Sequence, residues 1–142
     1  MRSLGSSRLA TSDGWNGVSR TATLETGARS AQLARRSLRE VCAVAGATED
    51  ITETAALLTS ELVTNAVTHG NGSPRLEIEV QSALLRVTVT DTGVGAPGRV
   101  VAAPLLAETG RGLVLVDALS ARWGTNPVDP RGKSVWFELD RD

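Results

Sequence analysis

The hydrophobic and polar positions of this chain follow a helical period in its first half. Between residues 28 and 45 the apolar positions recur at helical spacing: Ala34, Leu38, Val41, Cys42 and Ala45. Gly46 is typical of a helix end, and the acidic residues that follow Thr48 suit the start of a second helix. That second helix is predicted to run to His69 and Gly70, which together form a C-terminal signal.

From residue 75 the period of the pattern changes to two. The apolar positions alternate with polar ones on both sides of a short turn: Leu76, Ile78, Val80, Leu85, Val87 and Val89. This alternation predicts an antiparallel hairpin with one buried face. Asp91 continues the parity of Val89, so we expect a carboxylate on the core side at the end of the second strand.

The remaining segments complete an α+β pattern. Residues 92–109 have no clear period, contain several Gly and Pro residues, and form a longer connection than most loops. A helix is predicted after Gly112, followed by strands around residues 122–125 and 135–139. The order of elements predicts a two-layer α/β sandwich, with helices on one face of a mixed, mostly antiparallel sheet. Trp123 and Trp136 are expected to pack together on or near this sheet.

Length and composition indicate how many domains the chain has and which classes of partner are not expected. The chain has 142 residues, so one domain is expected. Residues 1–20 are rich in Ser, Gly, Thr and Arg without periodicity and are predicted to be a disordered tail, with the domain at 21–142. Residues 21–24 are expected to add a short strand at the start of the domain. The net charge of -1 gives no reason to expect direct binding of nucleic acid or an anionic membrane. The single Cys42 excludes an intramolecular disulfide, and no membrane span or signal core is visible, so a cytoplasmic location is expected.

Glu61 and Asn65 are the first candidate functional residues. They stand four positions apart, flanked by Leu58 and Leu62, and residues at this spacing share a helix face. We expect both on the core-facing stripe, where a carboxylate and an amide are costly unless a ligand or metal ion pairs with them. The face is therefore predicted to line a pocket. A pair at a helix edge in contact with water is the alternative.

Two glycine-containing clusters follow this pair along the chain. Asp91-Thr92-Gly93-Val94-Gly95 comes directly after a predicted strand, and Gly110-Arg111-Gly112-Leu113 opens a predicted helix. Taken alone, the first is also compatible with a simple turn and the second with a tight helix entry. A Gly-rich helix entry leaves backbone N–H groups that bind a phosphate well.

In this order and on these elements, the three clusters resemble the nucleotide-binding boxes of the GHKL (Bergerat-fold) ATPase family, which includes DNA gyrase and the sensor histidine kinases. The resemblance covers roughly residues 21–140. Within the family, the chain is most similar to the small bacterial anti-sigma-factor serine/threonine kinases. The closing segments Ala121-Arg122-Trp123-Gly124 and Gly132-Lys133-Ser134-Val135-Trp136 are also similar to that subgroup.

The resemblance implies a site for ATP and Mg²⁺. Asn65 would coordinate Mg²⁺ through its amide oxygen, beside oxygens of the triphosphate. Asp91 would accept a hydrogen bond from the adenine amino group. Gly93 and Gly95 would let the backbone approach the base and the ribose, where a side chain would collide.

The later boxes would complete the site. Residues 96–109 would form a lid over the phosphates, and the Gly110-Arg111-Gly112-Leu113 box would present its backbone amides to them, with Arg99 and Arg111 as candidates to neutralise the γ-phosphate. Ser134 occupies the position of the last box, although its strand parity is opposite to that of Val135. His69 is a candidate polar contact, and helix capping is its alternative role.

Glu61 is the residue on which the reaction depends. In a kinase that transfers to serine, a carboxylate near the γ-phosphate accepts the proton of the hydroxyl group. In relatives that hydrolyse ATP the corresponding acid activates water, and in histidine kinases the acceptor is a nitrogen. Glu61 therefore indicates competence for transfer without identifying the acceptor.

The first reading is an ATP- and Mg²⁺-dependent protein serine/threonine kinase that is also an anti-sigma factor. The resemblance implies that it phosphorylates a STAS-type anti-anti-sigma protein and binds a sigma factor, and that it forms a homodimer, as relatives commonly do. Relatives use their first helix in partner recognition, so four arginines are candidates for docking an acidic partner: Arg29, Arg35, Arg36 and Arg39. The alternatives are an ATP-dependent binding module with little or no transfer activity, and a detached catalytic domain of the histidine-kinase type.

Overall fold

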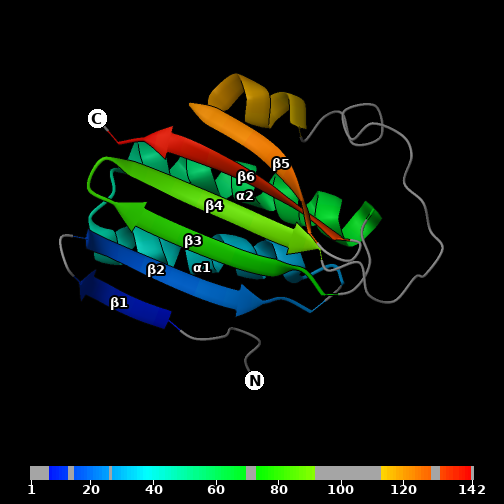
Figure 1. The fold of residues 1–142 in the computed structure, drawn as a ribbon, viewed down its shortest axis with the longest axis horizontal. Helices are drawn as coiled ribbons and strands as arrows, with labels where there is room; N and C mark the ends of the chain where they lie inside the picture. Colours follow the sequence, from blue (N-terminus) through cyan, green and yellow to red (C-terminus); the bar gives the residue numbers. More distant parts are fainter. Residues whose placement is uncertain are drawn as a thin grey trace.

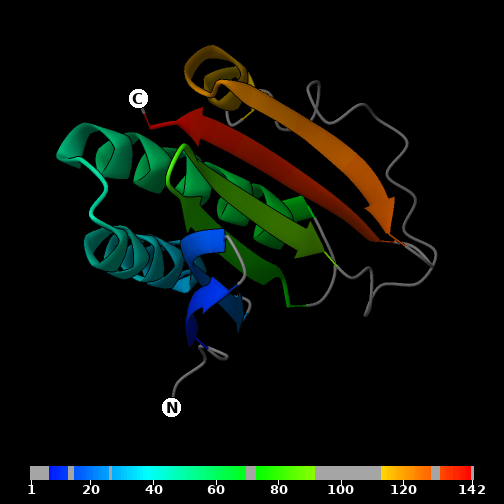
Figure 2. The ribbon, with the colours of Figure 1, turned by 60° about the vertical axis from the view of Figure 1, so that its left-hand side comes forward.

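The computed structural model describes residues 7–12, 15–25, 27–69, 73–91, 113–128 and 132–141. Two helices lie on one face of a six-stranded sheet with the strand order β1-β2-β3-β4-β6-β5 (Figure 1). Figure 2 shows both helices on the same side of that sheet. The expected α+β sandwich is therefore confirmed. All five described strand pairings are antiparallel, so the expected mixture contains no parallel pair in this part of the chain.

The strands follow the chain with one crossover. Their bounds are β1 (Ser7–Ser12), β2 (Trp15–Thr23), β3 (Arg75–Gln81), β4 (Leu84–Asp91), β5 (Arg122–Val128) and β6 (Gly132–Asp140). From β4 the chain passes to the sheet edge as β5 and returns as β6 between β4 and β5. Residues 113–119 are also helical.

The N-terminal residues differ from the sequence prediction. We expected residues 1–20 to be disordered, whereas β1 and most of β2 lie within them, so the expected boundary at residue 21 falls inside a strand. Val18 is partly buried against the core and Ala22 is fully buried. Between them, Arg20 donates to Ser37 Oγ (3.0 Å) and Glu40 Oε1 (2.7 Å) of the first helix. An arginine at an inward position hides the alternation that marks a strand.

Helix α1 (Ser30–Ala45) ends as the sequence predicts. Gly46 adopts the left-handed conformation with φ 75°, and the backbone N–H of Ala47 donates to the carbonyl of Cys42 at 3.0 Å. This bond closes a Schellman-type C-cap, for which glycine is the favoured residue. A side chain at position 46 would strain this helix end.

Helix α2 (Glu49–His69) also has the predicted bounds. It begins after Thr48, whose hydroxyl accepts a hydrogen bond from the backbone N–H of Ile51 at 3.2 Å, as an N-cap residue does. Among the described residues, no helix combines the length and apolar character needed to cross a bilayer.

The core lies between the helices and the sheet. Helix α1 packs on β2 and β3, whereas α2 packs on β4 and β6. The largest side chains that are fully buried in this layer include one aromatic residue and many aliphatic ones: Phe137, Leu24, Leu38, Leu58, Leu76, Ile78, Leu85 and Leu113. Full burial of each such side chain stabilises the fold by roughly 1.5–3 kcal/mol before entropic costs.

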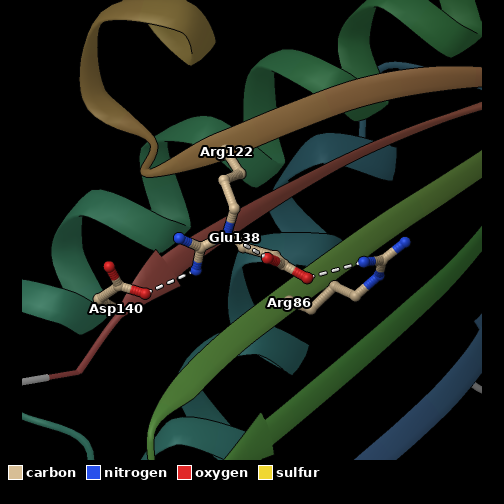
Figure 3. A network of polar contacts seen from close by, with 4 residues as sticks. All are labelled: Arg86, Arg122, Glu138 and Asp140. Carbon is tan, nitrogen blue, oxygen red and sulfur yellow. Dashed lines mark hydrogen bonds and ion pairs between the residues drawn. The ribbon is translucent and has the colours of Figure 1, made fainter.

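The opposite face of the sheet carries an ion-pair network instead of helices (Figure 3). Glu138 of β6 accepts from Arg86 of β4 at 2.7 Å and from Arg122 of β5 at 2.6 Å, and Arg122 also reaches Asp140 at 2.6 Å. The hydrogen bond from Arg122 lowers the pKa of Glu138, Arg86 acts in the same direction, and burial opposes both. The network ties three neighbouring strands together.

The two tryptophans of the last strands lie on opposite faces of the sheet. Trp136 is on the outer face, with the guanidinium of Arg86 4.3 Å from its ring centre, and a Cβ added to Gly124 would come within 2.9 Å of its indole. Trp123 points to the other side, where its Nε1 donates to Asp117 Oδ1 at 2.8 Å. We expected the two indoles to pack together. That prediction is wrong, because neighbouring pairs of the β5–β6 ladder alternate between faces.

Candidate functional site

Asp91 is a buried acid at the end of β4. Its exposure is 8%, and it lies two residues beyond Val89, which is 2% exposed and belongs to the core under the helices. Alternation along a strand places Asp91 on that same helix-facing side, as its parity in the sequence predicts. The carboxylate therefore lies on the side of the sheet on which α2 packs.

Glu61 and Asn65 lie on α2 at the edge of its buried stripe. Both side chains are half-buried, whereas Thr59 and Val63 are fully buried and mark the direction of the core. At about 100° per residue, Asn65 lies about 120° and Glu61 about 160° away from Thr59. Leu58 and Leu62, which flank the pair, are buried as well, and Asn65 lies only about 20° from Leu58 around the helix. The pair therefore lies at the margin of the core-facing stripe, beside its buried leucines. An edge position lets a carboxylate and an amide meet a ligand without the full cost of burial.

The C-terminal ends of α2 and β4 and the start of β6 lie at one end of the molecule in both views (Figure 1, Figure 2). Asn65 stands in the last turns of α2, and Asp91 is the last residue of β4. Because α2 packs on β4 and on β6, these elements bring the amide and the carboxylate to the same end of the fold. Glu61 stands one helical turn further from that end than Asn65.

Ser134 does not share this side of the sheet. In the β4–β6 ladder Ser134 pairs with Thr90, whereas Asp91 pairs with Lys133. Paired residues of an antiparallel ladder point to the same face, and neighbouring pairs point to opposite faces. Ser134 therefore lies on the outer face, away from α2 and on the side opposite to Asp91. The sequence already carried this signal in the opposite parities of Ser134 and Val135.

The remaining predicted site residues divide into two groups. Leu113 is 2% exposed and its side chain packs in the hydrophobic core, so only its backbone is available to a ligand. The other residues of the glycine boxes and the loop lie outside the described part of the chain: Gly93, Gly95, residues 96–109, Gly110, Arg111 and Gly112. The side chain of His69 lies outside it as well.

The described donors fit a nucleotide and a magnesium ion held jointly. No group of three or more His, Cys, Asp or Glu side chains that could hold a metal ion occurs in the ranges described above. Mg²⁺ in nucleotide sites needs few protein ligands, because phosphate oxygens and water supply the others. One amide oxygen from Asn65 beside a triphosphate is consistent with that chemistry, and the buried Asp91 carboxylate is a strong acceptor for an amino group.

A second feature lies on the outer surface of α1. Its arginines line an open hollow of about 600 Å³: Arg29, Arg35, Arg36 and Arg39, with Gln32, Leu33, Glu40 and Ala43. Arg39 is paired with Glu53 at 2.9 Å, and Glu40 is held mainly by Arg20 at 2.7 Å, whereas its contact with Arg36 is 3.8 Å. The positive charge of the hollow is therefore only partly neutralised by the acids near it.

Two residues near the candidate site were not singled out in the sequence. Lys133 is half-buried directly across from Asp91 in the β4–β6 ladder. Ser60, next to Glu61, accepts a hydrogen bond from Arg35 of α1 at 2.9 Å and so links the basic hollow to α2. The position of Lys133 near the site depends on strand register, and that of Ser60 depends on helix packing. Neither can be read from the pattern of apolar and polar residues in the sequence.

Comparison with known proteins agrees with the geometry. Residues 24–139 match the family of the histidine kinase-like ATPase domain. No curated protein sequence matches the chain. The matched range contains α1, α2 and the sheet from β3 to β6, so it covers every described residue of the candidate site.

Proposed function

Because the chain belongs to the family of histidine kinase-like ATPase domains, we propose that it is an ATP- and Mg²⁺-dependent protein serine/threonine kinase and an anti-sigma factor. Its phosphoacceptor is a serine of a STAS-type anti-anti-sigma protein, and its other partner is a sigma factor. The observation that supports this best is the buried Asp91 on the helix side of the sheet, at the end of the fold where α2 carries Glu61 and Asn65.

The side chains of the site have separate tasks in this proposal. Asp91 accepts a hydrogen bond from the amino group of adenine and fixes the base, and Asn65 holds Mg²⁺ through its amide oxygen. Bound Mg²⁺ neutralises charge on the phosphates. Glu61 accepts the proton of the serine hydroxyl as that oxygen bonds to the γ-phosphorus and the bond from phosphorus to the β,γ-bridging oxygen breaks. The products are phosphoserine and ADP.

The basic hollow of α1 supports the choice of protein partners. It is an open surface with partly unneutralised arginines, which favours an acidic protein surface. The hydrogen bond from Arg35 to Ser60 connects that surface to the residue beside Glu61. A partner seated on α1 therefore lies against a helix that directly contacts the proposed catalytic helix.

The test is transfer of label from γ-labelled ATP to purified candidate STAS proteins, with the wild type and two variants. The wild type is expected to label a serine, and changing that serine to alanine in the partner should abolish labelling. Glu61→Gln should keep nucleotide affinity within a few-fold while the transfer rate falls by roughly 10²–10⁴. Asn65→Ala should instead weaken Mg²⁺-dependent nucleotide binding, because it removes a metal ligand.

The possible results distinguish the proposed kinase from the two alternative functions. Transfer at the wild-type rate by Glu61→Gln would remove Glu61 as the base. Binding of ATP and of a partner without any transfer would indicate an ATP-dependent binding module. Label on a histidine would indicate the histidine-kinase type.

A further inference from the structure

We propose that Lys133, and not Ser134, is the residue through which β6 contacts the nucleotide. Its ammonium group donates a hydrogen bond to N1 of adenine, beside the amino group that Asp91 binds. This assignment rests on the proposed function, because it needs a nucleotide whose base lies at Asp91. It adds a specificity-determining residue that the glycine boxes do not contain.

The first argument is the side of the sheet that each residue faces. On the inner side, three successive pairs of the β4–β6 ladder have at least one deeply buried member: Leu85–Leu139, Val87–Phe137 and Val89–Val135. The next pair of this series is Asp91–Lys133. Lys133 is therefore on the side of α2, where the proposed ligand binds.

The residues on the outer side support the same conclusion. The pair Thr90–Ser134 continues a series that contains Thr88–Trp136 and Arg86–Glu138. Arg86 and Glu138 belong to the ion-pair network on the face without helices (Figure 3). A hydroxyl at position 134 is thus separated from a nucleotide at Asp91 by the thickness of the sheet.

The second argument is reach. Side chains directly opposite each other in an antiparallel ladder have Cβ atoms about 4.5–5.5 Å apart. Lysine carries its ammonium on a flexible stem of four carbons. An ammonium at position 133 can therefore reach a ring atom next to the group that Asp91 binds.

The third argument is chemical complementarity. The edge of adenine presents an amino donor beside the N1 acceptor, so a carboxylate and an ammonium side by side match it with two charge-assisted hydrogen bonds. Guanine presents an acceptor oxygen in place of the amino group, which a carboxylate repels. Asp91 and Lys133 as a pair therefore select adenine more strongly than Asp91 alone.

In the part of the sheet that the structure describes, Asp91 is the one acid paired in register with Lys133. Its neighbour on the other side is Pro127 of β5, which carries no charge. The nearest acids along its own strand, Glu138 and Asp140, are engaged by Arg122 on the outer face. Lys133 is also the one lysine of the chain, so a change at this position removes the only primary ammonium side chain.

Calorimetric titration with ADP and with 1-deaza-ADP, in which N1 is replaced by C–H, tests the assignment. Lys133→Met should weaken ADP binding by roughly tenfold to a hundredfold. Ser134→Ala, the adjacent residue on the opposite face, should remain within about twofold. In the wild type 1-deaza-ADP should bind more weakly than ADP by a similar factor, and in Lys133→Met the two ligands should bind alike.

Control variants keep the result interpretable. Lys133→Gln retains a donor without the charge and should fall between the wild type and Lys133→Met, with thermal unfolding measured for every protein. Equal ADP affinity in Lys133→Met and the wild type overturns the assignment, as does a large loss in Ser134→Ala. If Asp91→Asn weakens ADP binding while Lys133→Met does not, this assignment alone fails. A wild type that binds no ADP overturns the proposed function and this assignment together.

Discussion

Two threonines of α2 differ in whether their side-chain hydroxyl has a hydrogen-bond partner. The hydroxyl of Thr52 donates to the backbone carbonyl of Thr48 at 2.8 Å. The hydroxyl of Thr59, two turns further, is fully buried and has no hydrogen-bond partner in the described structure. A buried hydroxyl without a partner costs about 1–3 kcal/mol. Thr59 is therefore expected to lower the stability of the fold at a fully buried position of α2.

We predict that Thr59→Val raises the free energy of unfolding by about 1 kcal/mol, because a methyl group replaces an unsatisfied hydroxyl of similar size. Urea denaturation monitored by circular dichroism measures the change. Thr52→Val is the matched control, and it should be neutral or destabilising because it removes a hydrogen bond that exists. A loss of stability in Thr59→Val similar to that in Thr52→Val contradicts the prediction.

At the scale of elements, the stability contributed by the outer-face ion-pair network of β4, β5 and β6 depends on pH. The pKa of Glu138 is lowered in the folded protein, first by Arg122 and then by Arg86. An acid whose pKa falls on folding contributes stability that is present above its unfolded-state pKa and lost as the pH falls through its folded-state pKa. Both arginines are partly exposed, so solvent screens the pair.

We predict that Glu138→Gln lowers the free energy of unfolding at pH 7 by about 1 kcal/mol. The difference from the wild type should shrink as the pH falls below the ordinary glutamate pKa of 4.5. Urea denaturation at pH 7 and at pH 3 measures both values. A difference that is constant over this range would show that the charge of Glu138 is not the cause.

Elements with regular periodicity could be predicted from the sequence, and those that depend on pairing could not. The bounds of α1, α2, β3 and β4 followed from apolar spacing and from Gly46 and Thr48 at the helix ends. Only the end of β2 was predicted, as a short strand at residues 21–24, because Arg20 occupies an inward position, where it bonds to α1 instead of to solvent. Its face becomes clear only when the pairing with β3 is known.

The same limit applies to the candidate site. Asp91 was placed on the correct side because it continues an apolar alternation, whereas Glu61 and Asn65 were placed too close to the core. Their flanking leucines, Leu58 and Leu62, are buried as expected, but the two polar side chains lie at the margin of this stripe and stay partly exposed. Lys133 became a candidate only through the register of β4 and β6.

At the scale of the whole molecule, charge is distributed unevenly. The net charge is only -1, yet the outer surface of α1 gathers four arginines around one open hollow. Such a patch on a nearly neutral protein accelerates and orients encounter with an acidic partner more than it adds affinity. It therefore bears on the partner proposal and not on the stability of the fold.

We predict that Arg36→Glu, at a side chain that is 72% exposed, slows association with an acidic partner by roughly tenfold at low salt. The effect should diminish as the ionic strength rises, because salt screens exposed charges. Stopped-flow association rates with the partner identified in the transfer assay measure it. Arg75→Glu, on the face of β3 opposite to α1, makes the same charge change and should slow association much less. Equal effects of the two variants would contradict docking on α1.

The central claim is that a nucleotide binds at Asp91, where β4 ends beside α2. Calorimetric titration of ADP into the wild type and Asp91→Asn tests it most directly, with thermal unfolding to verify that both proteins are folded. The account predicts that Asp91→Asn loses roughly tenfold to a hundredfold in affinity, the effect of removing one charge-assisted hydrogen bond of about 1.5–3 kcal/mol. Equal ADP affinity in the two folded proteins would contradict it.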